Sequence, residues 1–211
     1  MHKNKIYIAA TGGTIDSYYD SHKPAPYEVP LDGHTEIPQA MNLLGIKDYG
    51  FKQYANTDSK SLPKNTIRKI IADAISRDYD KVIITMGTDR MPNCAEFAQR
   101  ILPQYGHKAQ NVRIVFTGAM QPLRDENKDF FSESDAVKNL KFAYENLQNE
   151  SFKGVRAAMH VNGNPEMVLC DPKHLKKRVT TDGEGHVKKS GFEYDAAAAK
   201  SCEQQRQTYS R

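Results

Sequence analysis

Short apolar runs, most of them followed by glycine, alternate along this chain with longer amphipathic segments, and this alternation limits its fold more than any other feature. Runs rich in β-branched and small apolar residues lie at 5–10, 81–86, 112–117 and 154–161, and a weaker one lies at 51–55. Such runs are typical of strands that are buried on both faces of a sheet. The sequence therefore predicts the strands of a mostly parallel sheet.

The segments between these runs have the periodicity of amphipathic helices. Apolar residues recur at i, i+3 and i+4 in 63–77, 92–105 and 134–147, and a shorter segment of this kind covers 36–44. Strands that alternate with helices indicate right-handed βαβ units. We therefore predict a three-layer α/β fold, with a mostly parallel, flavodoxin-like sheet and helices on both faces.

Three stretches fit neither pattern. The segment 16–31 is about 16 residues long, longer than a usual connection, which makes it a candidate lid. The segment 123–133 is charged and typical of a loop, and the chain after Phe192 is polar, as in a surface helix or a frayed tail. We predict one domain over residues 1–192 and a polar C-terminal tail over 193–211.

Composition and charge exclude several classes of protein. The 30 lysines and arginines exceed the 26 aspartates and glutamates by only +4, and they are spread out, whereas nucleic-acid binding requires a basic patch. No apolar run approaches the roughly 18 residues of a membrane span, and the N-terminus lacks the apolar core of a signal peptide. Three cysteines at unrelated spacings predict neither a disulfide framework nor a zinc site. We expect a cytoplasmic protein that binds no metal, nucleic acid or membrane.

Hydroxyl groups, carboxylates and glycines follow several predicted strands at the point where each ends. The first strand runs into T-G-G-T at 11–14, the central strand into G-T-D at 87–89, and the weak strand into D-S at 58–59. Ligands of open α/β sheets bind beyond the carboxyl ends of the strands. Two threonines on neighbouring loops are suited to nucleophilic attack and proton transfer if a base lies near, and Asp89 could receive a substrate ammonium.

Each of these motifs also fits a purely structural role. T-G-G-T could be a tight turn, and Thr88 and Ser59 could be helix caps. Their occurrence at successive strand ends favours a ligand site instead. A nucleotide loop is disfavoured because the chain lacks both the G-x-G-x-x-G order and the Walker lysine, and the G-x-S-x-G elbow of serine hydrolases is also absent.

Three motifs, taken in order, resemble signatures of the bacterial-type L-asparaginase/glutaminase family. They are A-T-G-G-T-I at 10–15, T-M-G-T-D-R-M at 85–91 and F-T-G-A-M-Q-P at 116–122, the last followed by S-D-A at 134–136. The resemblance covers about residues 5–177 and is greatest to short members that lack a full second domain. It implies the fold of the asparaginase N-terminal domain and an amidohydrolase of amino-acid metabolism. L-asparagine, or L-glutamine, would be its substrate, and it would need no cofactor.

The resemblance also implies roles for individual residues. Thr14 would be the nucleophile that forms a covalent threonyl intermediate, with a lid tyrosine, either Tyr19 or Tyr27, beside it. Thr88 and Asp89 would form a second cluster with a lysine, which is Lys177 or, as the alternative, Lys176. Ser59 would bind the substrate α-carboxylate and Asp89 its α-ammonium. The other expected substrate-binding residues are Asp58, Gly87 and Ala119.

Two departures from the family pattern bear on affinity. Met86 replaces a usual histidine and is expected to pack at the strand end, whereas Arg90 replaces a usual threonine after Asp89. Arg90 either pairs with Asp89 and competes with the substrate ammonium, which would raise KM, or points away with the following helix. A homo-oligomer is expected to close the site. The alternative function is a non-catalytic or weakly active protein that binds aspartate, asparagine or glutamine.

Overall fold

A six-stranded sheet forms the centre of the computed structural model, which describes residues 5–20, 27–30, 33–63, 65–125, 127, 129–148, 152–160, 167–181 and 187–195. The strand order is β4-β1-β5-β6-β7-β8. All neighbouring pairs are parallel except β7 and β8. The parallel part has the order 2-1-3-4-5 typical of flavodoxin-like folds. The strands are β1 (Ile6–Ala10), β4 (Tyr49–Gln53), β5 (Lys81–Thr85), β6 (Arg113–Thr117), β7 (Gly154–His160) and β8 (Met167–Cys170).

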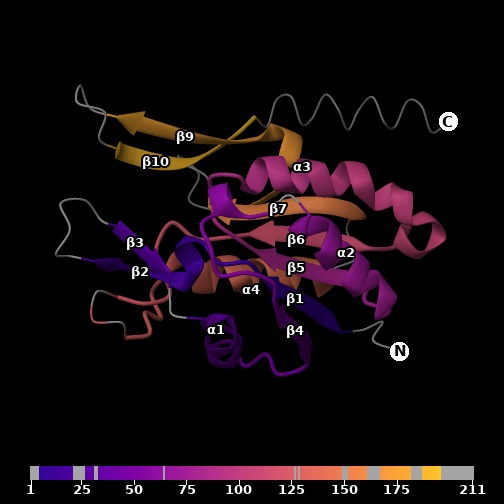
Figure 1. Ribbon diagram of the computed structural model, residues 1–211, viewed down its shortest axis with the longest axis horizontal. Helices are drawn as coiled ribbons and strands as arrows, with labels where there is room; N and C mark the ends of the chain where they lie inside the picture. The colour runs from indigo at the N-terminus through magenta and orange to yellow at the C-terminus, as the bar shows by residue number, and fades with distance from the viewer. Residues whose placement is uncertain are drawn as a thin grey trace.

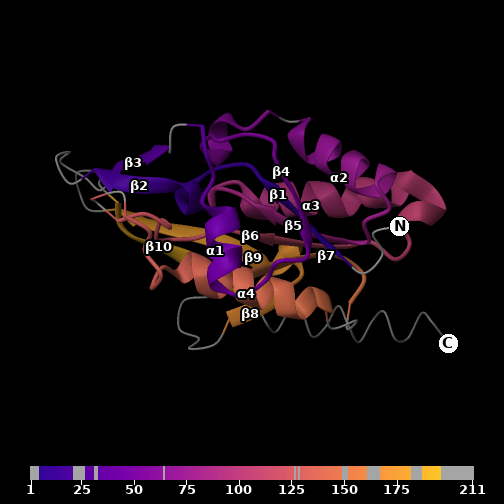
Figure 2. The same cartoon turned by 90° about the horizontal axis from the view of Figure 1, so that it is seen from below.

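Helices cover both faces of this sheet (Figures 1 and 2). On one face lie α2 (Thr66–Ser76) and α3 (Met91–Ile101), and on the other lie α1 (Ile37–Leu43) and α4 (Asp135–Gln148). Strand β1 supplies side chains to both layers, because successive residues of a strand point to opposite faces. All five of its residues are buried. The predicted three-layer α/β fold is confirmed.

The segment 16–31, expected as a lid-like loop, contains regular structure instead. It begins within the 3-10 turn η1 (Thr14–Asp16) and continues as an antiparallel hairpin of β2 (Ser17–Asp20) and β3 (Tyr27–Pro30). Tyrosine and valine favour strands, but the polar and proline neighbours concealed the alternation. Figure 1 shows this hairpin beyond the end of the sheet where β1 and β5 finish.

A second hairpin was not predicted at all. It follows β8 and the 3-10 turn η4 (Pro172–His174), and it pairs β9 (Leu175–Thr181) with β10 (Val187–Tyr194). Its sequence is mostly polar, so no apolar run marked it; Leu175 and Phe192 are buried among the residues whose burial is described. Strand β10 continues past the boundary drawn at residue 192, and residues 196–211 of the expected tail lie outside the described residues. The division into one domain over residues 1–192 and a tail over 193–211 stays a prediction.

Strand β8 was not predicted either, and the other elements depart from the prediction mainly at their ends. The helix expected over 92–105 ends as α3 at Ile101, because Pro103 cannot continue it, and the 3-10 segment η3 (Leu102–Ala109) follows. A third 3-10 turn, η2 (Ser59–Ser61), comes after β4. The stretch 123–133 is a loop, as expected, with one isolated bridge between Arg124 and Phe130. Within the described residues, no helix is both long and apolar enough to cross a membrane.

Glycines bring the loops at the carboxyl ends of the strands into backbone contact. A Cβ atom added to Gly13 would lie 2.2 Å from the Cα atom of Gly87, and one added to Gly118 would lie 2.4 Å from the carbonyl oxygen of Met86. Gly13 also has φ 87° and ψ −169°, a backbone conformation that is essentially restricted to glycine. The loops after β1, β5 and β6 therefore meet only because these positions have no side chain.

We predict that Gly13→Ala lowers the free energy of unfolding by more than about 3 kcal/mol, because strain and a clash with rigid backbone add together. Gly45→Ala is the matched control. Gly45 also has positive φ, at 71°, but an added Cβ meets nothing within 4 Å, so strain alone should cost about 1 kcal/mol. Urea denaturation measures both, and equal losses would contradict the importance of the loop contact.

Candidate active site

Two buried threonines lie where the loops after β1 and β5 touch. Thr14 and Thr88 directly follow the contacting glycines Gly13 and Gly87 in the chain, and they are only 6% and 3% exposed. A Cβ atom on Gly87 would also lie 3.0 Å from the hydroxyl oxygen of Ser59. Three loops therefore bring the hydroxyl-bearing residues Thr14, Thr88 and Ser59 to the same part of the sheet edge.

A lysine from the second hairpin completes this group. The Nζ atom of Lys177 donates a hydrogen bond to Oγ1 of Thr88 at 2.8 Å and forms an ion pair with Oδ1 of Asp89. The lysine side chain is 15% exposed, so the pair is largely removed from water. The structure thus joins a hydroxyl, an amine and a carboxylate across 88 positions of sequence.

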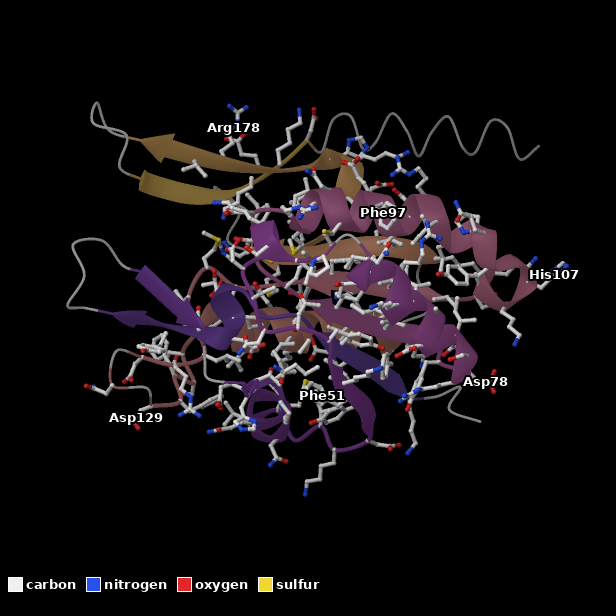
Figure 3. The ribbon with its side chains drawn as sticks, in the orientation of Figure 1. Phe51, Asp78, Phe97, His107, Asp129 and Arg178 are labelled. Carbon is white, nitrogen blue, oxygen red and sulfur yellow. The ribbon has the colours of Figure 1, made fainter. Side chains whose placement is uncertain are left out.

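The alternation of a β-strand decides which lysine reaches the threonine. Lys177 lies opposite Phe192 in the hairpin, and Phe192 is fully buried. Its neighbours Lys176 and Arg178 are exposed, and Figure 3 shows Arg178 pointing away from the body of the protein. Arg178 pairs with Glu193 on the adjacent strand at 2.6 Å. Only Lys177 of these three contacts Thr88 and Asp89.

Asp89 carries two ammonium groups on one carboxylate. Lys177 lies on Oδ1, and the Nζ atom of Lys60 lies 2.8 Å from Oδ2. Burial by itself would raise the pKa of this carboxyl, but the hydrogen bonds from Lys177 and Lys60 outweigh burial and lower the pKa of Asp89 below its usual value. Asp89 is therefore a stable anion. Lys60 was not singled out from the sequence, although its place next to Ser59 was a usable signal.

Arg90 points away from Asp89, the second of the two arrangements considered above. Its guanidinium donates to the backbone carbonyls of Ser59, Lys60 and Leu62, each at 3.4 Å. Its backbone N–H donates to Oγ of Ser59 at 3.3 Å. The expectation that Arg90 competes for Asp89 is thus wrong, because the loop carbonyls lie nearer to its long side chain. Arg90 instead holds the loop that contains Ser59.

The same arginine lines a cavity of about 270 Å³ between α2 and α3. We predict that Arg90→Thr accelerates hydrogen exchange of the backbone amides of 59–62 by about tenfold, because lost hydrogen bonds of roughly 1 kcal/mol allow the loop to open locally. Arg100→Thr is the control, since Arg100 lines the same cavity and its guanidinium stacks on the ring of Phe97. Exchange that is unchanged in Arg90→Thr would contradict this role.

The loop after β6 is held from α4. The carboxylate of Asp135 accepts from the backbone N–H groups of Met120 and Gln121 at 2.9 and 2.8 Å, and Asn139 donates to the carbonyl of Gly118 at 2.8 Å. The contacts of Asp135 explain the S-D-A signal seen in the sequence. Ala119, expected to bind substrate, is completely buried within this loop.

The other expected site residues are less closely placed. Asp58 is exposed, and its Oδ1 accepts from the backbone N–H of Lys60 at 2.7 Å, so it caps η2. Tyr19 and Tyr27 lie on the paired strands β2 and β3, opposite Glu28 and Asp20; their side chains lie outside the described residues. Among the described residues, no three His, Cys, Asp or Glu side chains gather as metal ligands.

Asp16 anchors the turn that carries Thr14 and was not predicted. Its carboxylate accepts from the Thr35 hydroxyl at 2.8 Å and from the backbone N–H of Glu36 at 2.9 Å, and Glu36 pairs with Arg124. Burial raises the pKa of Asp16 to about 6, although both hydrogen bonds oppose this rise. The anchor is therefore a buried acid that carries its charge at some cost at neutral pH.

This burial gives the fold a testable pH dependence. The folded protein binds a proton at Asp16 up to about pH 6, whereas the unfolded chain releases it near 4, so this group destabilises the fold as pH rises through that window. We compare the free energy of unfolding of Asp16→Asn with that of the wild type. We predict that the difference, variant minus wild type, rises by about 1–3 kcal/mol between pH 4 and pH 7. Urea denaturation at intervals of one pH unit measures this. Parallel curves would rule it out.

The fold and the site together define an α/β protein with a buried hydroxyl–lysine–carboxylate cluster at the carboxyl edge of its sheet. Residues 5–185 match the family model described as the N-terminal part of asparaginase, so the chain belongs to the asparaginase family. The resemblance drawn from the three motifs is therefore confirmed. Membership of this family supports an amidohydrolase type of activity.

Individual relatives agree with this assignment. The chain is 26% identical over 160 residues to a glutamyl-tRNA(Gln) amidotransferase subunit of Aeropyrum pernix, covering 75% of this chain and 35% of that protein. It is 26% identical over 136 residues to L-asparaginase 1 of Escherichia coli K12, covering 61% of this chain and 38% of that protein. The chain thus spans little more than a third of these curated relatives.

Solved structures of the same fold extend the comparison. The structure of a probable cytoplasmic L-asparaginase from Campylobacter jejuni superimposes with a TM-score of 0.63 at 24% identity, covering 92% of this chain and 54% of that one. A thermostable L-asparaginase from Thermococcus kodakarensis gives 0.56 at 20% identity, covering 90% and 51%. At these identities the likeness shows the shared fold.

Proposed function

We propose that this protein hydrolyses the side-chain amide of L-asparagine to L-aspartate and ammonia through a covalent threonyl ester. The observation that carries the proposal is the contact of Lys177 with both Thr88 and Asp89, next to the loop of Thr14. A hydroxyl nucleophile needs a neighbouring group that can take its proton. A buried amine bonded to a second hydroxyl is suited to that task.

The proposed reaction has two steps. In the first, Oγ1 of Thr14 attacks the amide carbon and gives up its proton, which Thr88 and Lys177 relay to the leaving nitrogen; a C–O bond forms, the C–N bond breaks, and ammonia leaves. In the second, water attacks the ester carbon, the ester C–O bond to Thr14 breaks, one proton of the water passes to Oγ1 of Thr14, and L-aspartate is released. Backbone N–H groups of the closely packed glycine loops would stabilise the oxyanion. These groups are all part of the chain, so we propose no cofactor.

Substrate recognition would use the residues around this point. We propose that Ser59 binds the α-carboxylate, that Asp89 binds the α-ammonium, and that the loops of Gly87 and Ala119 form the walls. Asp58 would act through the loop it caps, and Tyr19 or Tyr27 would come from the first hairpin. L-glutamine is a second candidate substrate, since one methylene changes discrimination by only about 1–3 kcal/mol.

We further propose that a homo-oligomer, in the cytoplasm, closes the site. The main support is that Asp89 and Lys60 face solvent, with side chains 28% and 72% exposed, so the ligand would be covered on one side only. The buried, unpaired Cys94 and Cys170 are compatible with a reducing compartment. The similar proteins include a probable cytoplasmic L-asparaginase and an amidotransferase subunit. The names of both refer to reactions of amides, which supports the proposed substrate class.

We predict that Thr14→Ala, Thr88→Ala and Lys177→Met each lower kcat for ammonia release from L-asparagine by at least about 10³-fold, because each removes a group that acts on the reacting atoms. Lys176→Met is the matched control. It removes an exposed lysine from the same strand and should retain wild-type activity.

Turnover close to wild type in any of the first three variants would remove that residue from the mechanism. Loss of activity in Lys176→Met alone would show that the wrong lysine was assigned. Calorimetry with L-aspartate tests the alternative, a binding protein. Binding by a wild-type protein that releases no ammonia from either amide would favour that alternative.

A further inference from the structure

The carboxylate of Asp89 has ammonium groups on both of its oxygens. Lys177 occupies Oδ1 from the inside, with a side chain only 15% exposed. Lys60 occupies Oδ2 at 2.8 Å from the solvent side, with a side chain 72% exposed. The inner pair belongs to the proposed proton-transfer group, whereas the outer lysine takes no part in the proposed reaction.

The loop of Lys60 is held in place from two sides. Its backbone N–H donates to Oδ1 of Asp58 at 2.7 Å, and its carbonyl accepts from the guanidinium of Arg90 at 3.4 Å. The ammonium group itself sits at the end of four rotatable bonds. Lys60 is therefore anchored beside Ser59, but its charged end can leave Asp89 when another cation takes its place.

The charges around this carboxylate disfavour an additional cation. Among the residues that the structure describes, Lys60, Lys177 and Arg90 bring three positive charges to the loop, against Asp89 and the exposed Asp58. A substrate ammonium that approaches Asp89 must displace Lys60 or lie close to its like charge, which is unfavourable at this distance. A substrate carboxylate near Ser59 meets the opposite situation, because the surplus charge attracts it.

We propose that Lys60 is a specificity-determining residue that occupies the place of a substrate α-ammonium on Asp89. The site then favours small ω-amides that carry a carboxylate but no α-ammonium, such as succinamate, over L-asparagine. This inference rests on the proposed function, and in particular on Asp89 as the group that meets the substrate α-position. L-asparagine remains a substrate, but it has to displace the lysine first.

The test compares kcat/KM for succinamate and L-asparagine in the wild type, in Lys60→Gln and in a control. In the wild type, succinamate should be the better substrate. Lys60→Gln should lower KM for L-asparagine by about three- to tenfold, the range expected for a partly exposed charge pair, with little change in kcat. The same substitution should not raise kcat/KM for succinamate. The shift should shrink in high salt, because an exposed pair is screened.

Lys108→Gln is the matched control. It removes the same charge next to His107, which Figure 3 shows at the opposite end of the molecule from the two hairpins, and it should leave the substrate ratio unchanged. A wild type that prefers L-asparagine, or a Lys60→Gln variant with an unchanged ratio, overturns the inference while the proposed hydrolysis stands.

Product binding separates this inference from the chemistry. If neither amide is hydrolysed, the proposed function fails. The affinities of succinate and L-aspartate, measured by calorimetry, still test the role of Lys60. The inference expects succinate to bind the wild type more tightly than L-aspartate, and Lys60→Gln to reverse or abolish that preference. The same preference in both proteins overturns it.

Discussion

The contact between Gly13 and Gly87 is the constraint on which the site depends. Gly13 can approach the backbone of Gly87 this closely only because it carries no side chain, and the residues that follow the two glycines are Thr14 and Thr88. The parallel sheet makes this contact possible, because it directs the carboxyl ends of β1 and β5 to the same edge. Fold and site are thus joined first by a packing requirement, and hydrogen bonds from Asp16, Arg90 and Asp135 then hold the loops in place.

Charge pairing provides the second level of organisation. A single carboxylate, Asp89, connects the loop after β5 to the loop of Lys60 and to the second hairpin through Lys177. Arg90 takes no part in this group, since the carbonyls of 59–62 occupy its guanidinium. Adjacent residues therefore serve different purposes: Asp89 gathers the cations, and Arg90 supports the loop that presents one of them.

Five strands of the central sheet and its helices could be predicted, because burial leaves a regular apolar pattern in their sequences; strand β8, at the edge of the sheet, was not predicted. Strands covered on both faces read as continuous apolar runs, and helices with one buried face read as a 3.6-residue repeat. Both hairpins escaped prediction. Each is a two-stranded ribbon, and among the residues of β9 and β10 whose burial is described, Leu175 and Phe192 are the large apolar side chains in the core.

The sequence by itself determined the fold class and the strand ends at which the candidate site lies. It also indicated the two threonines, because hydroxyl and glycine residues recur where successive strands end, and a parallel sheet brings those ends to one edge. Only the tertiary structure decided which cations meet Asp89. Among Lys60, Arg90, Lys176 and Lys177, the choice depends on strand alternation and on which carbonyls and carboxylates lie within reach of long side chains. That information is a matter of distances in space, which residue types and their spacing along the chain do not contain.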